Sequence, residues 1–485
     1  MESKTLASSF IWKFSERILS QGLGLVIQII IARMINPEAV GEMAILLSVI
    51  NLFSIVTQSG FSSYIIQKKN LTNDIISTVT SISILLSVGC ILLCLGFGNA
   101  IMEFIGYPRL GAFLKVYGFV LLFQSINGIC MGLLSRDMKF KEMFLRTLIV
   151  LPLSACVCFA FIFADMDLEA LIAYNIVNPA FTTVFLLLLL KNEDCKVRLK
   201  IDSRLLKEAL PYSLRVLGQD VGNALCYSLR NITMGSAYSA NDLAFYDRAF
   251  TYTSYVEESI TYTASSVLLP AMAKVQDDKK LFKEYIVNAT ALYSIVVIPA
   301  LLGFAAIAPT FTTVILSDKW MPCVPFMYVF AVGFLHYPIL TIHRPAYLAC
   351  GRSDVTLKIS IIQNIISLLM LMITVRISPI WVAIGTSVSL LSYVPLFVFE
   401  TKKQWGISFA DQMGALCKYI LLSLIMSFII YPINSFSLNG ILKILLQIFI
   451  GIAIYAILLF GLKDKYFMMV LMKICNKLNE KESKS

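Results

Sequence analysis

Long apolar runs, separated by short polar segments, follow one another along almost the whole chain. They lie at 10–34, 40–66, 75–98, 110–134, 145–164, 168–190, 211–235, 243–269, 284–316, 322–348, 355–374, 378–400, 413–434 and 439–462. A helix needs about 20 consecutive apolar residues to cross the hydrocarbon core of a bilayer. The pattern therefore predicts an all-α polytopic membrane protein with about fourteen transmembrane helices and no sizeable soluble domain.

The composition agrees with this class of protein and adds an orientation. Hydrophobic residues make up 58% of the chain and charged residues 14%, whereas a soluble domain carries about 25% charged residues. If the N-terminus is placed inside, most of the 40 lysines and arginines fall in the inside loops and the tail. Because this bias sets the orientation of membrane helices, both termini are expected to be cytoplasmic. The net charge of +10 then reflects orientation in a lipid bilayer, and no nucleic-acid partner is expected.

Two classes of function lack their motifs in this chain. There is no Gly-rich phosphate-binding loop followed by Lys and Ser or Thr, which argues against an ATPase motor. The 11 cysteines lie mostly within the apolar runs and show no metal-ligand spacing. We therefore expect them to be reduced packing residues, and we expect no metal site.

An octet with the pattern Arg-x-Leu-x-Gln-x-x-Gly occurs twice, at residues 17–24 and at residues 215–222. Each copy lies one or two turns inside the first span of its half. Because an even number of spans separates the copies, the two halves share one orientation in the membrane. The repeat predicts two parallel six-helix lobes plus two C-terminal helices. The expected boundaries are 1–190 for the N-lobe, 191–210 for a basic cytoplasmic linker, 211–400 for the C-lobe, and 401–485 for the two extra helices and a cytoplasmic tail.

The octets place charge and amide groups on one stripe of each helix. An arginine in a membrane helix costs several kcal/mol unless it faces a polar interior. Polar side chains alone could serve as hydrogen-bonding contacts between helices, but such contacts do not require a charge. The arginines therefore favour a polar substrate cavity. Its candidate residues on the first, second and seventh spans are Arg17, Gln21, Gln28, Asn51, Gln58, Arg215, Gln219 and Arg230, with Asp220 as a candidate counter-charge.

The eighth span is unusually polar, because most residues between 246 and 266 are polar or tyrosine. Lipid would not tolerate such a surface. One face carries the substrate-binding candidates Arg248, Tyr252, Tyr255 and Tyr262, and Glu258 lies on its flank, whereas Glu257 points to the opposite side. Both glutamates are candidates for a coupling-ion carboxylate or for the counter-charge of an empty arginine site. The alternative is a buried salt bridge with an arginine of another helix.

Three segments carry a resemblance to a known family. The first span ends in Ile31-Ala-Arg-Met-Ile-Asn-Pro-Glu-Ala-Val-Gly41, similar to the family pattern AR-x-L-x-P-x-x-F/Y-G. The others are Leu134–Lys141 after the fourth span and Ala349–Asp354 after the tenth. The chain resembles bacterial polysaccharide exporters of the multidrug/oligosaccharidyl-lipid/polysaccharide superfamily, the Wzx-type flippases, and in particular their colanic-acid-exporter-like branch. Val40 and Met43 replace the usual aromatic residues of the first motif.

The resemblance implies a fold, an activity and partners. The fold would be two six-helix lobes with two added helices. The activity would be movement of an undecaprenyl-diphosphate-linked oligosaccharide across the bacterial inner membrane by alternating access, in a protein that is not an enzyme and needs no cofactor. Coupling to an H⁺ or Na⁺ gradient stays open. The protein would function as a monomer near polysaccharide polymerase or export proteins. Guanidinium groups match phosphate oxygens bidentately, so the arginines would bind the diphosphate and the tyrosine-rich face the sugars.

Two other functions are weighed against this one. A multidrug/cation antiporter of the same fold should have an acidic site, whereas here the arginines within the spans match or outnumber the acids. A membrane-embedded polysaccharide polymerase or transferase would need a large loop with catalytic groups, and no such loop is visible.

Overall fold

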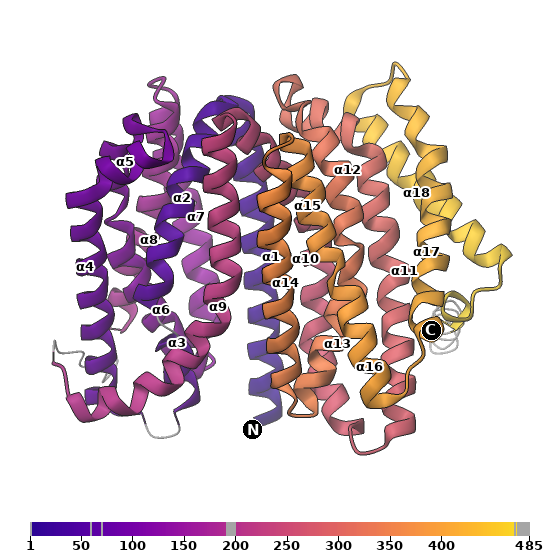
Figure 1. The fold of residues 1–485 in the computed structure, drawn as a ribbon, viewed down its shortest axis with the longest axis horizontal. Helices are drawn as coiled ribbons and strands as arrows, with labels where there is room; N and C mark the ends of the chain where they lie inside the picture. Colours follow the sequence, from indigo (N-terminus) through magenta and orange to yellow (C-terminus); the bar gives the residue numbers. More distant parts are fainter. Residues whose placement is uncertain (1, 59–60, 69–70, 191–199, 470–471, 473–485) are drawn as a thin grey trace, which may run out of the picture. The chain divides into compact units, whose positions relative to one another are not determined.

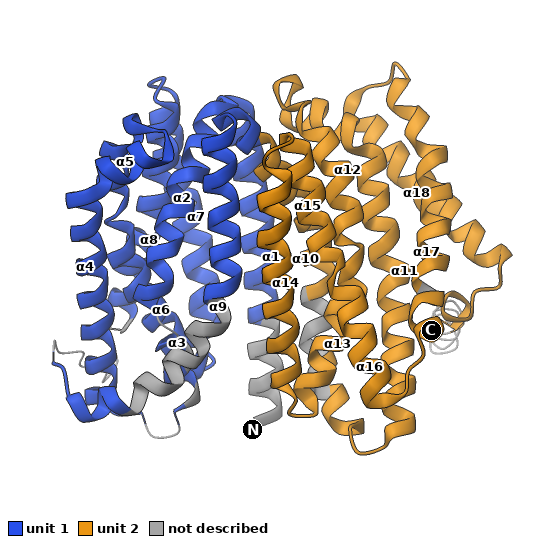
Figure 2. Ribbon diagram, in the orientation of Figure 1, with its two compact units in different colours: residues 1–244 blue, residues 245–485 orange. Residues whose placement is uncertain are grey.

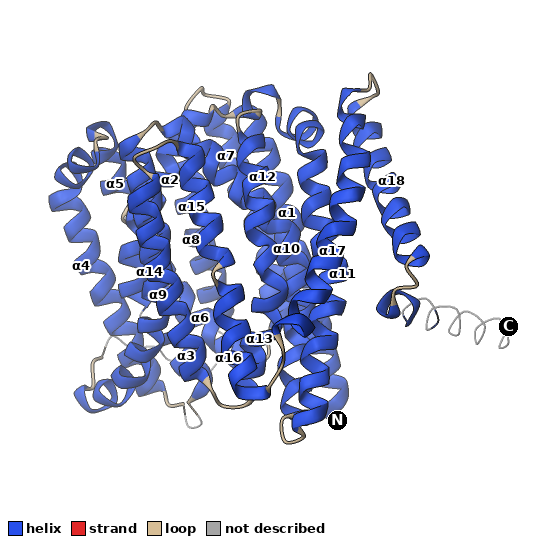
Figure 3. Cartoon of the chain, turned by 45° about the vertical axis from the view of Figure 1, so that its right-hand side comes forward, coloured by secondary structure: helices blue, strands red, loops and turns tan. Residues whose placement is uncertain are grey.

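The computed structural model describes residues 2–58, 61–68, 71–190, 200–469 and 472 (Figure 1). Within helices, it leaves some side chains undescribed, mainly those of residues 2–11, 208–220 and 262–267. By contacts the chain divides into two compact units, residues 1–244 and residues 245–485 (Figure 2). Throughout the described residues the secondary structure is helical and contains no strand (Figure 3). This confirms the predicted all-α class.

The first unit contains the following helices, of which η1 is a 3₁₀ turn. They are α1 (Glu2–Met34), α2 (Pro37–Gln58), α3 (Phe61–Gln67), α4 (Asn73–Ile105), η1 (Pro108–Leu110), α5 (Gly111–Tyr117), α6 (Val120–Arg136), α7 (Phe140–Ile162), α8 (Asp167–Leu190) and α9 (Ser203–Ala237). The unit ends shortly after the start of α10 (Ala240–Val275).

The second unit contains the rest of α10 and the helices that follow. They are α11 (Lys279–Phe311), η2 (Thr312–Leu316), η3 (Asp318–Trp320), α12 (Cys323–Gly333), η4 (Phe334–His336), α13 (Tyr337–Ala349), α14 (Ser353–Thr374), α15 (Pro379–Leu391), α16 (Tyr393–Trp405), α17 (Phe409–Ile430), η5 (Tyr431–Ser435) and α18 (Gly440–Gly461). Here η2 is a π-helical turn, and η3, η4 and η5 are 3₁₀ turns.

Twelve helices among the described residues are long and apolar enough to cross a membrane. The two expected spans outside this set, at 211–235 and 243–269, correspond to α9 and α10, which have 35 and 36 residues. At 1.5 Å per residue each is about 50 Å long, which exceeds a hydrocarbon core of about 30 Å. Both are therefore long enough to span, but their composition is polar. The count of fourteen spans stays a prediction.

In the first unit, α1 packs along α7, and α7 packs along α8. Aromatic side chains hold the first of these pairs, since the rings of Trp12 and Phe144 meet edge to face with centroids 5.3 Å apart. A cluster of buried apolar side chains from α3, α4, α6, α7 and α8, including Ile65, Ile76 and Leu134, forms a core of this unit. Arg136, in the second resemblance segment, donates to the carbonyls of Ile65 and Lys68 and so ties the end of α6 to the end of α3.

In the second unit, α11 is the central helix and packs against α12, α13, α17 and α18. Asn434 in η5 joins the two C-terminal helices to α11. Its amide donates to the carbonyl of Ala306 (2.9 Å) and accepts from Thr310 (2.6 Å) and Gln447 (3.0 Å). These bonds satisfy polar groups that would find no hydrogen-bond partner in lipid. They therefore fix the two added helices to this unit.

The expected lobe boundaries remain a proposal. The contacts place the break inside α10, after Ala244, and they group α9 with α2, α3 and α4. The sequence repeat instead makes α9 the first helix of the second half.

Gly41, in the first resemblance segment, lies where α2 meets the turn between α9 and α10. A Cβ atom at this position would overlap the backbone carbonyl of Ala240. Backbone cannot yield as a flexible side chain does, so we expect Gly41→Ala to lower stability by more than about 1–3 kcal/mol, the usual cost of overpacking. Thermal unfolding of the purified protein would measure this loss. Gly89→Ala in α4, where a Cβ meets no atom within 4 Å, is the matched control; equal melting temperatures for both variants would contradict the close packing.

Candidate functional site

Near Arg17, helix α1 is held against α7 by a buried acid, Glu16. Glu16 lies 3.4 Å from the Arg146 guanidinium and accepts from the Thr147 hydroxyl at 3.3 Å. Arg17 follows in the helix and is turned by about 100° from Glu16. The Arg17 side chain is partly exposed within the first unit, as are those of Gln21 and Gln28. The α1 stripe predicted from the sequence is therefore half-buried, and its substrate contacts stay predictions.

The second octet lies in α9, and the structure describes the side chains only at its end, from residue 221. Arg215, Gln219 and Asp220 fall among the side chains outside the described set, so their predicted roles stay predictions. Further along α9, Arg230 is 9% exposed, and its guanidinium lies over the Tyr227 ring at 5.4 Å from the centroid. A buried guanidinium is costly in a membrane helix, the aromatic face offsets only part of that cost, and such residues mark ion and substrate pathways.

A residue that the sequence did not single out lies beside Arg230. Asn231 is fully buried, and within the described residues neither its amide nitrogen nor its amide oxygen has a hydrogen-bond partner. A buried amide without a partner costs about 1–3 kcal/mol. The sequence offers only its place next to Arg230 as a hint. Asn231 is therefore an additional candidate for contact with a polar cargo.

The two candidate residues on α2 differ in their exposure. Asn51 is half-buried and Gln58 is exposed in the first unit. The backbone carbonyl of Asn51 accepts from the Ser54 hydroxyl at 3.0 Å. These contacts are local to the helix, and the predicted substrate contacts of Asn51 and Gln58 stay predictions.

The α10 residues of the expected sugar-binding face have different environments within the second unit. Arg248 and Tyr255 are half-buried, whereas Tyr252 is almost fully buried. The Tyr252 ring meets Phe311 edge to face at 5.8 Å and Tyr255 at 6.5 Å. Tyr262 falls among the side chains outside the described set. Tyr252 therefore has the surroundings of a packing residue, and Tyr255 is the more accessible of the two.

A buried carboxyl group lies on the opposite side of α10. Glu257 is only 1% exposed, and Glu258 is half-buried. The Tyr293 hydroxyl donates to the Glu257 carboxylate at 3.2 Å, and the hydroxyls of Thr261 and Tyr337 also bond it. Among the described residues no lysine, arginine or histidine is within ion-pair distance of Glu257. The salt-bridge alternative therefore has no support at Glu257 in the described part of the chain.

The hydroxyl partners of Glu257 come from three helices, α10, α11 and α13. Tyr293 and Tyr337 lie in apolar stretches of α11 and α13, and no spacing in the sequence relates them to Glu257. Only the packing of the second unit brings them together. The sequence located the acid but not its partners.

A cavity of about 540 Å³ opens beside this cluster, between α10, α11 and α13. Its walls are mostly apolar and include Ile260, Leu292 and Val296. Tyr293 lines the cavity and also bonds Glu257. Asn288, on the cavity wall, accepts from the Tyr466 hydroxyl at 2.8 Å. The second unit thus combines an apolar groove with a buried acid directly behind one wall.

A second cavity, of about 450 Å³, lies in the first unit and is acidic. Glu38, Glu42, Asp167 and Glu169 line it, and Arg109 forms an ion pair with Glu42 at 2.8 Å. The described residues contain no group of three or more histidine, cysteine, aspartate or glutamate side chains placed to hold a metal ion. We assign no ligand to this cavity.

Sequence comparisons relate the chain to proteins of polysaccharide biosynthesis. Residues 30–325 match a family described as polysaccharide biosynthesis protein. Lipopolysaccharide biosynthesis protein WzxC of Escherichia coli (strain K12) is 20% identical over 429 residues, which cover 88% of this chain and 85% of that protein. Succinoglycan biosynthesis transport protein ExoT of Rhizobium meliloti (strain 1021) is 18% identical over 69% of this chain and 67% of that protein.

Solved structures share the fold. Lipid II flippase MurJ in an inward closed conformation matches with a TM-score of 0.74 and 17% identity over 96% of this chain and 99% of that chain. An inward-facing multidrug resistance transporter of the MATE family matches with a TM-score of 0.64 and 15% identity over 84% of this chain and 99% of that chain. At these identities the likeness concerns the fold alone.

Proposed function

Because this chain belongs to the family of polysaccharide biosynthesis proteins, matched over residues 30–325, we propose that it is a flippase for a lipid-linked oligosaccharide. The cargo would be an undecaprenyl-diphosphate-linked glycan, moved from the inner to the outer leaflet of the bacterial inner membrane. The family match confirms the resemblance drawn from the three sequence segments. The full-length similarity to WzxC, and the names of WzxC and ExoT, support polysaccharide export as the process.

The observation that carries the proposal is the pair of polar helices α9 and α10. Both are long enough to cross the bilayer, yet neither is among the apolar spans found in the described part of the chain. Arg230 is buried on α9, and Arg248 is half-buried on α10. Helices of this kind require a polar path through the membrane. A cargo with a diphosphate and sugars needs such a path, whereas a purely apolar drug does not.

The parts of the cargo find matching chemistry in the two units. Guanidinium groups of Arg17 and Arg230 would bind phosphate oxygens in bidentate fashion. The half-buried Tyr255 offers an aromatic face to sugar rings. The apolar groove lined by Leu292 and Val296 gives a hydrocarbon chain a surface similar to lipid. Alternating access would then expose the polar path to each side of the membrane in turn, in a protein that acts as a monomer near polysaccharide polymerase or export proteins.

A transport assay on the purified protein tests this proposal. The full-length protein is reconstituted in vesicles that hold a fluorescent polyprenyl-diphosphate-linked oligosaccharide. A membrane-impermeant glycosidase then reports how much glycan reaches the outer leaflet. We expect protein-dependent movement, and none in vesicles that hold heat-inactivated protein. A cation antiporter of the same fold would instead extrude organic cation dyes and leave the glycan in place, and this outcome would reject the flippase.

The orientation is a proposal with a direct test. Reporter fusions after Lys69, Lys200 and Lys403 should all report a cytoplasmic location, because the inside loops hold most lysines and arginines. An alkaline phosphatase and a green fluorescent protein reporter at the same sites check each other, since only one of them is active on each side. A periplasmic result at two of the three sites would reject the predicted topology.

A further inference from the structure

The first half of α1 is held on α7 by a series of side-chain contacts along one face of the helix. The Trp12 ring meets the Phe144 ring edge to face. The Lys13 ammonium lies over the Phe140 ring, 5.3 Å from its centroid, and 3.8 Å from the Glu16 carboxylate. The apolar part of these contacts brings the helices together, but hydrophobic attraction has no preferred direction. It therefore does not by itself fix the angle at which α1 lies on α7.

The directional contact between the two helices is a buried ion pair with a hydroxyl partner. The Arg146 guanidinium lies 3.4 Å from the Glu16 carboxylate and donates to the Thr147 hydroxyl at 2.7 Å, and that hydroxyl lies 3.3 Å from the same carboxylate. The Glu16 side chain is 10% exposed and that of Arg146 is 20% exposed. Separating such a pair leaves an uncompensated charge in apolar surroundings. Glu16 therefore stays on α7.

Apolar packing alone would allow other rotations of α1. Leu19, Leu25 and Ile27 lie on three different sides of the helix at 100° per residue. A helix with apolar groups on several sides can pack on a neighbour in more than one rotation. A single buried polar residue fixes the register of many coiled coils, and we expect the Glu16 pair to fix the rotation of α1 in the same way.

The rotation of α1 determines the direction of the octet arginine. Glu16 and Arg17 are neighbours in the helix, so their side chains diverge by about 100°. With Glu16 on α7, Arg17 lies on the adjoining stripe together with Gln21 and Gln28, and all three side chains are half-buried. A rotation by one residue would instead bring Arg17 against α7.

We propose that Glu16 is a positioning residue, which acts through Arg146 and Thr147 to set the rotation of α1 and so to aim the Arg17 guanidinium at the anionic group of the cargo. This role rests on the proposed function, which supplies the diphosphate. Glu16 itself does not contact the cargo, because its carboxylate is bonded by Arg146 and Thr147. The role is thus distinct from the coupling and counter-charge roles of the glutamates on α10.

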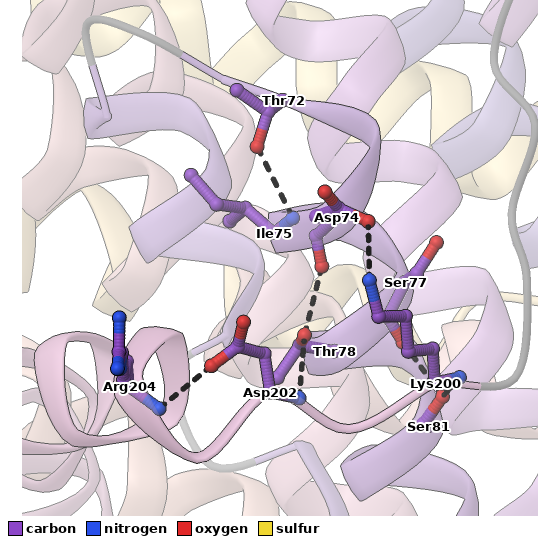
Figure 4. A network of polar contacts seen from close by, with 9 residues as sticks. All are labelled: Thr72, Asp74, Ile75, Ser77, Thr78, Ser81, Lys200, Asp202 and Arg204. Carbon is purple, nitrogen blue, oxygen red and sulfur yellow. Dashed lines mark hydrogen bonds and ion pairs between the residues drawn. The ribbon is translucent and has the colours of Figure 1, made fainter.

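An exposed ion pair in the same unit offers a matched control. The Lys200 ammonium lies 3.3 Å from the Asp74 carboxylate (Figure 4), but these side chains are 58% and 64% exposed. Water screens an exposed pair, so it contributes little to stability. The neighbouring bond from the Asp202 amide to the Thr78 hydroxyl, at 3.3 Å, does not use the Asp74 side chain (Figure 4). Asp74→Ala therefore removes an acid from the unit without releasing a helix.

A pair of apolar substitutions separates position from stability. Glu16→Leu together with Arg146→Met removes both charges at once, and such replacements are often neutral or stabilising. We expect an unchanged or higher melting temperature. Binding of polyprenyl diphosphate, measured by isothermal titration, should nevertheless weaken by about tenfold or more, because a misplaced charged group loses most of its effect. Asp74→Ala should change neither quantity. Unchanged binding in the apolar pair would overturn the inference.

The same substitutions in an Arg17→Ala background show whether the pair acts through Arg17. If Glu16 and Arg146 only aim Arg17, the apolar pair should weaken binding by less than about twofold in that background, since residues that act through one another are not additive. A loss as large as in the presence of Arg17 would mean that the pair contributes to binding by another route, such as direct contact of Arg146 with the phosphate. That result would also overturn the inference.

Thiol reactivity reports the rotation of α1 without any cargo. The thiol introduced by Arg17→Cys is alkylated with a charged, water-soluble reagent, and mass spectrometry of the peptide distinguishes it from the native cysteines. We expect alkylation to slow by about threefold or more when Glu16→Leu and Arg146→Met are added, because reactivity follows exposure. Asp74→Ala should leave the rate unchanged. Equal rates with and without the ion pair would overturn the inference. Absence of polyprenyl diphosphate binding in the wild-type protein would reject the proposed function, whereas the alkylation rates would still decide whether Glu16 sets the rotation of α1.

Discussion

Replacing Arg17 or Arg215 by alanine is expected to lower glycan export by about 10- to 100-fold without loss of protein from the membrane. The two residues occupy the same place in the repeated octet, and the Arg17 side chain is half-buried. A hydrogen bond to a charged group contributes about 1.5–3 kcal/mol, and each 1.36 kcal/mol is a factor of ten in rate. One lost guanidinium therefore accounts for an effect of this size. Export is measured as cell-surface polysaccharide in a flippase-deficient strain that expresses each variant.

Two further variants make this result specific. Lysine at Arg17 or Arg215 should restore only part of the export, because an ammonium group is a point charge and lacks the planar fork that matches phosphate. Arg376→Ala, at an exposed arginine just after α14, is the matched control and should export normally. If Arg17→Ala and Arg215→Ala both export as well as Arg376→Ala does, the octets do not bind the diphosphate and the anion site lies elsewhere.

The lengths of the apolar runs along the chain predicted most of the fold, because a membrane helix must bury nearly every side chain in lipid or protein. Each predicted span corresponds to a helix in the structure. Several spans consist of two shorter helices, such as α12 and α13, which η4 separates. Apolarity does not encode such breaks, and Pro338 is only a weak indication of this one. The polar composition of α10 was visible as well, and the expectation that α10 is not an ordinary lipid-facing helix stays a prediction.

The sequence could not predict which helices pack against each other. A repeat establishes that α9 and α1 are equivalent in origin, but it does not say which neighbours each helix keeps. The close contacts of Gly41 with Ala240 at the start of α10, and of Gly235 in α9 with Ile45 in α2, depend on the absence of a side chain, which leaves no pattern to read. Lys418 is a similar case. This lysine lies within α17, and the structure pairs it with Asp464 just beyond α18.

The same limit applies to the acid of the candidate site. Helical geometry put Glu258 on the flank of the tyrosine-rich face and Glu257 on the opposite side, and both were candidates for a coupling or counter-charge role. Which of them is enclosed depends on Tyr293 and Tyr337 from other helices. Glu257 is the enclosed one. The role of this enclosed carboxyl group can be tested by mutation.

Glu257→Gln is expected to leave cargo binding intact and to remove the dependence of transport on an ion gradient. A buried carboxylate without a counter-charge is costly, so Glu257 needs a bound proton or cation whenever its surroundings are closed. Glutamine keeps the shape of the side chain and still accepts from the Tyr293 hydroxyl, but it cannot exchange a proton or attract a cation. Flipping in the reconstituted vesicles, with and without an imposed H⁺ or Na⁺ gradient, measures the effect.

The half-buried neighbour Glu258 separates coupling from charge balance. If Glu258 is the counter-charge of an empty arginine site, Glu258→Gln should tighten binding of polyprenyl diphosphate, because the arginines lose a competitor for the phosphate oxygens, and the response to the gradient should persist. Coupling through Glu257 predicts the opposite pair of results for Glu257→Gln, namely unchanged binding and a lost response. Isothermal titration of each variant and of the double variant would separate these roles, since independent sites give additive changes. Unchanged binding together with an unchanged response in Glu257→Gln would leave Glu257 as a hydrogen-bonded link between α10, α11 and α13. In that case the driving force would have to come from another carboxylate or from consumption of the glycan on the far side of the membrane.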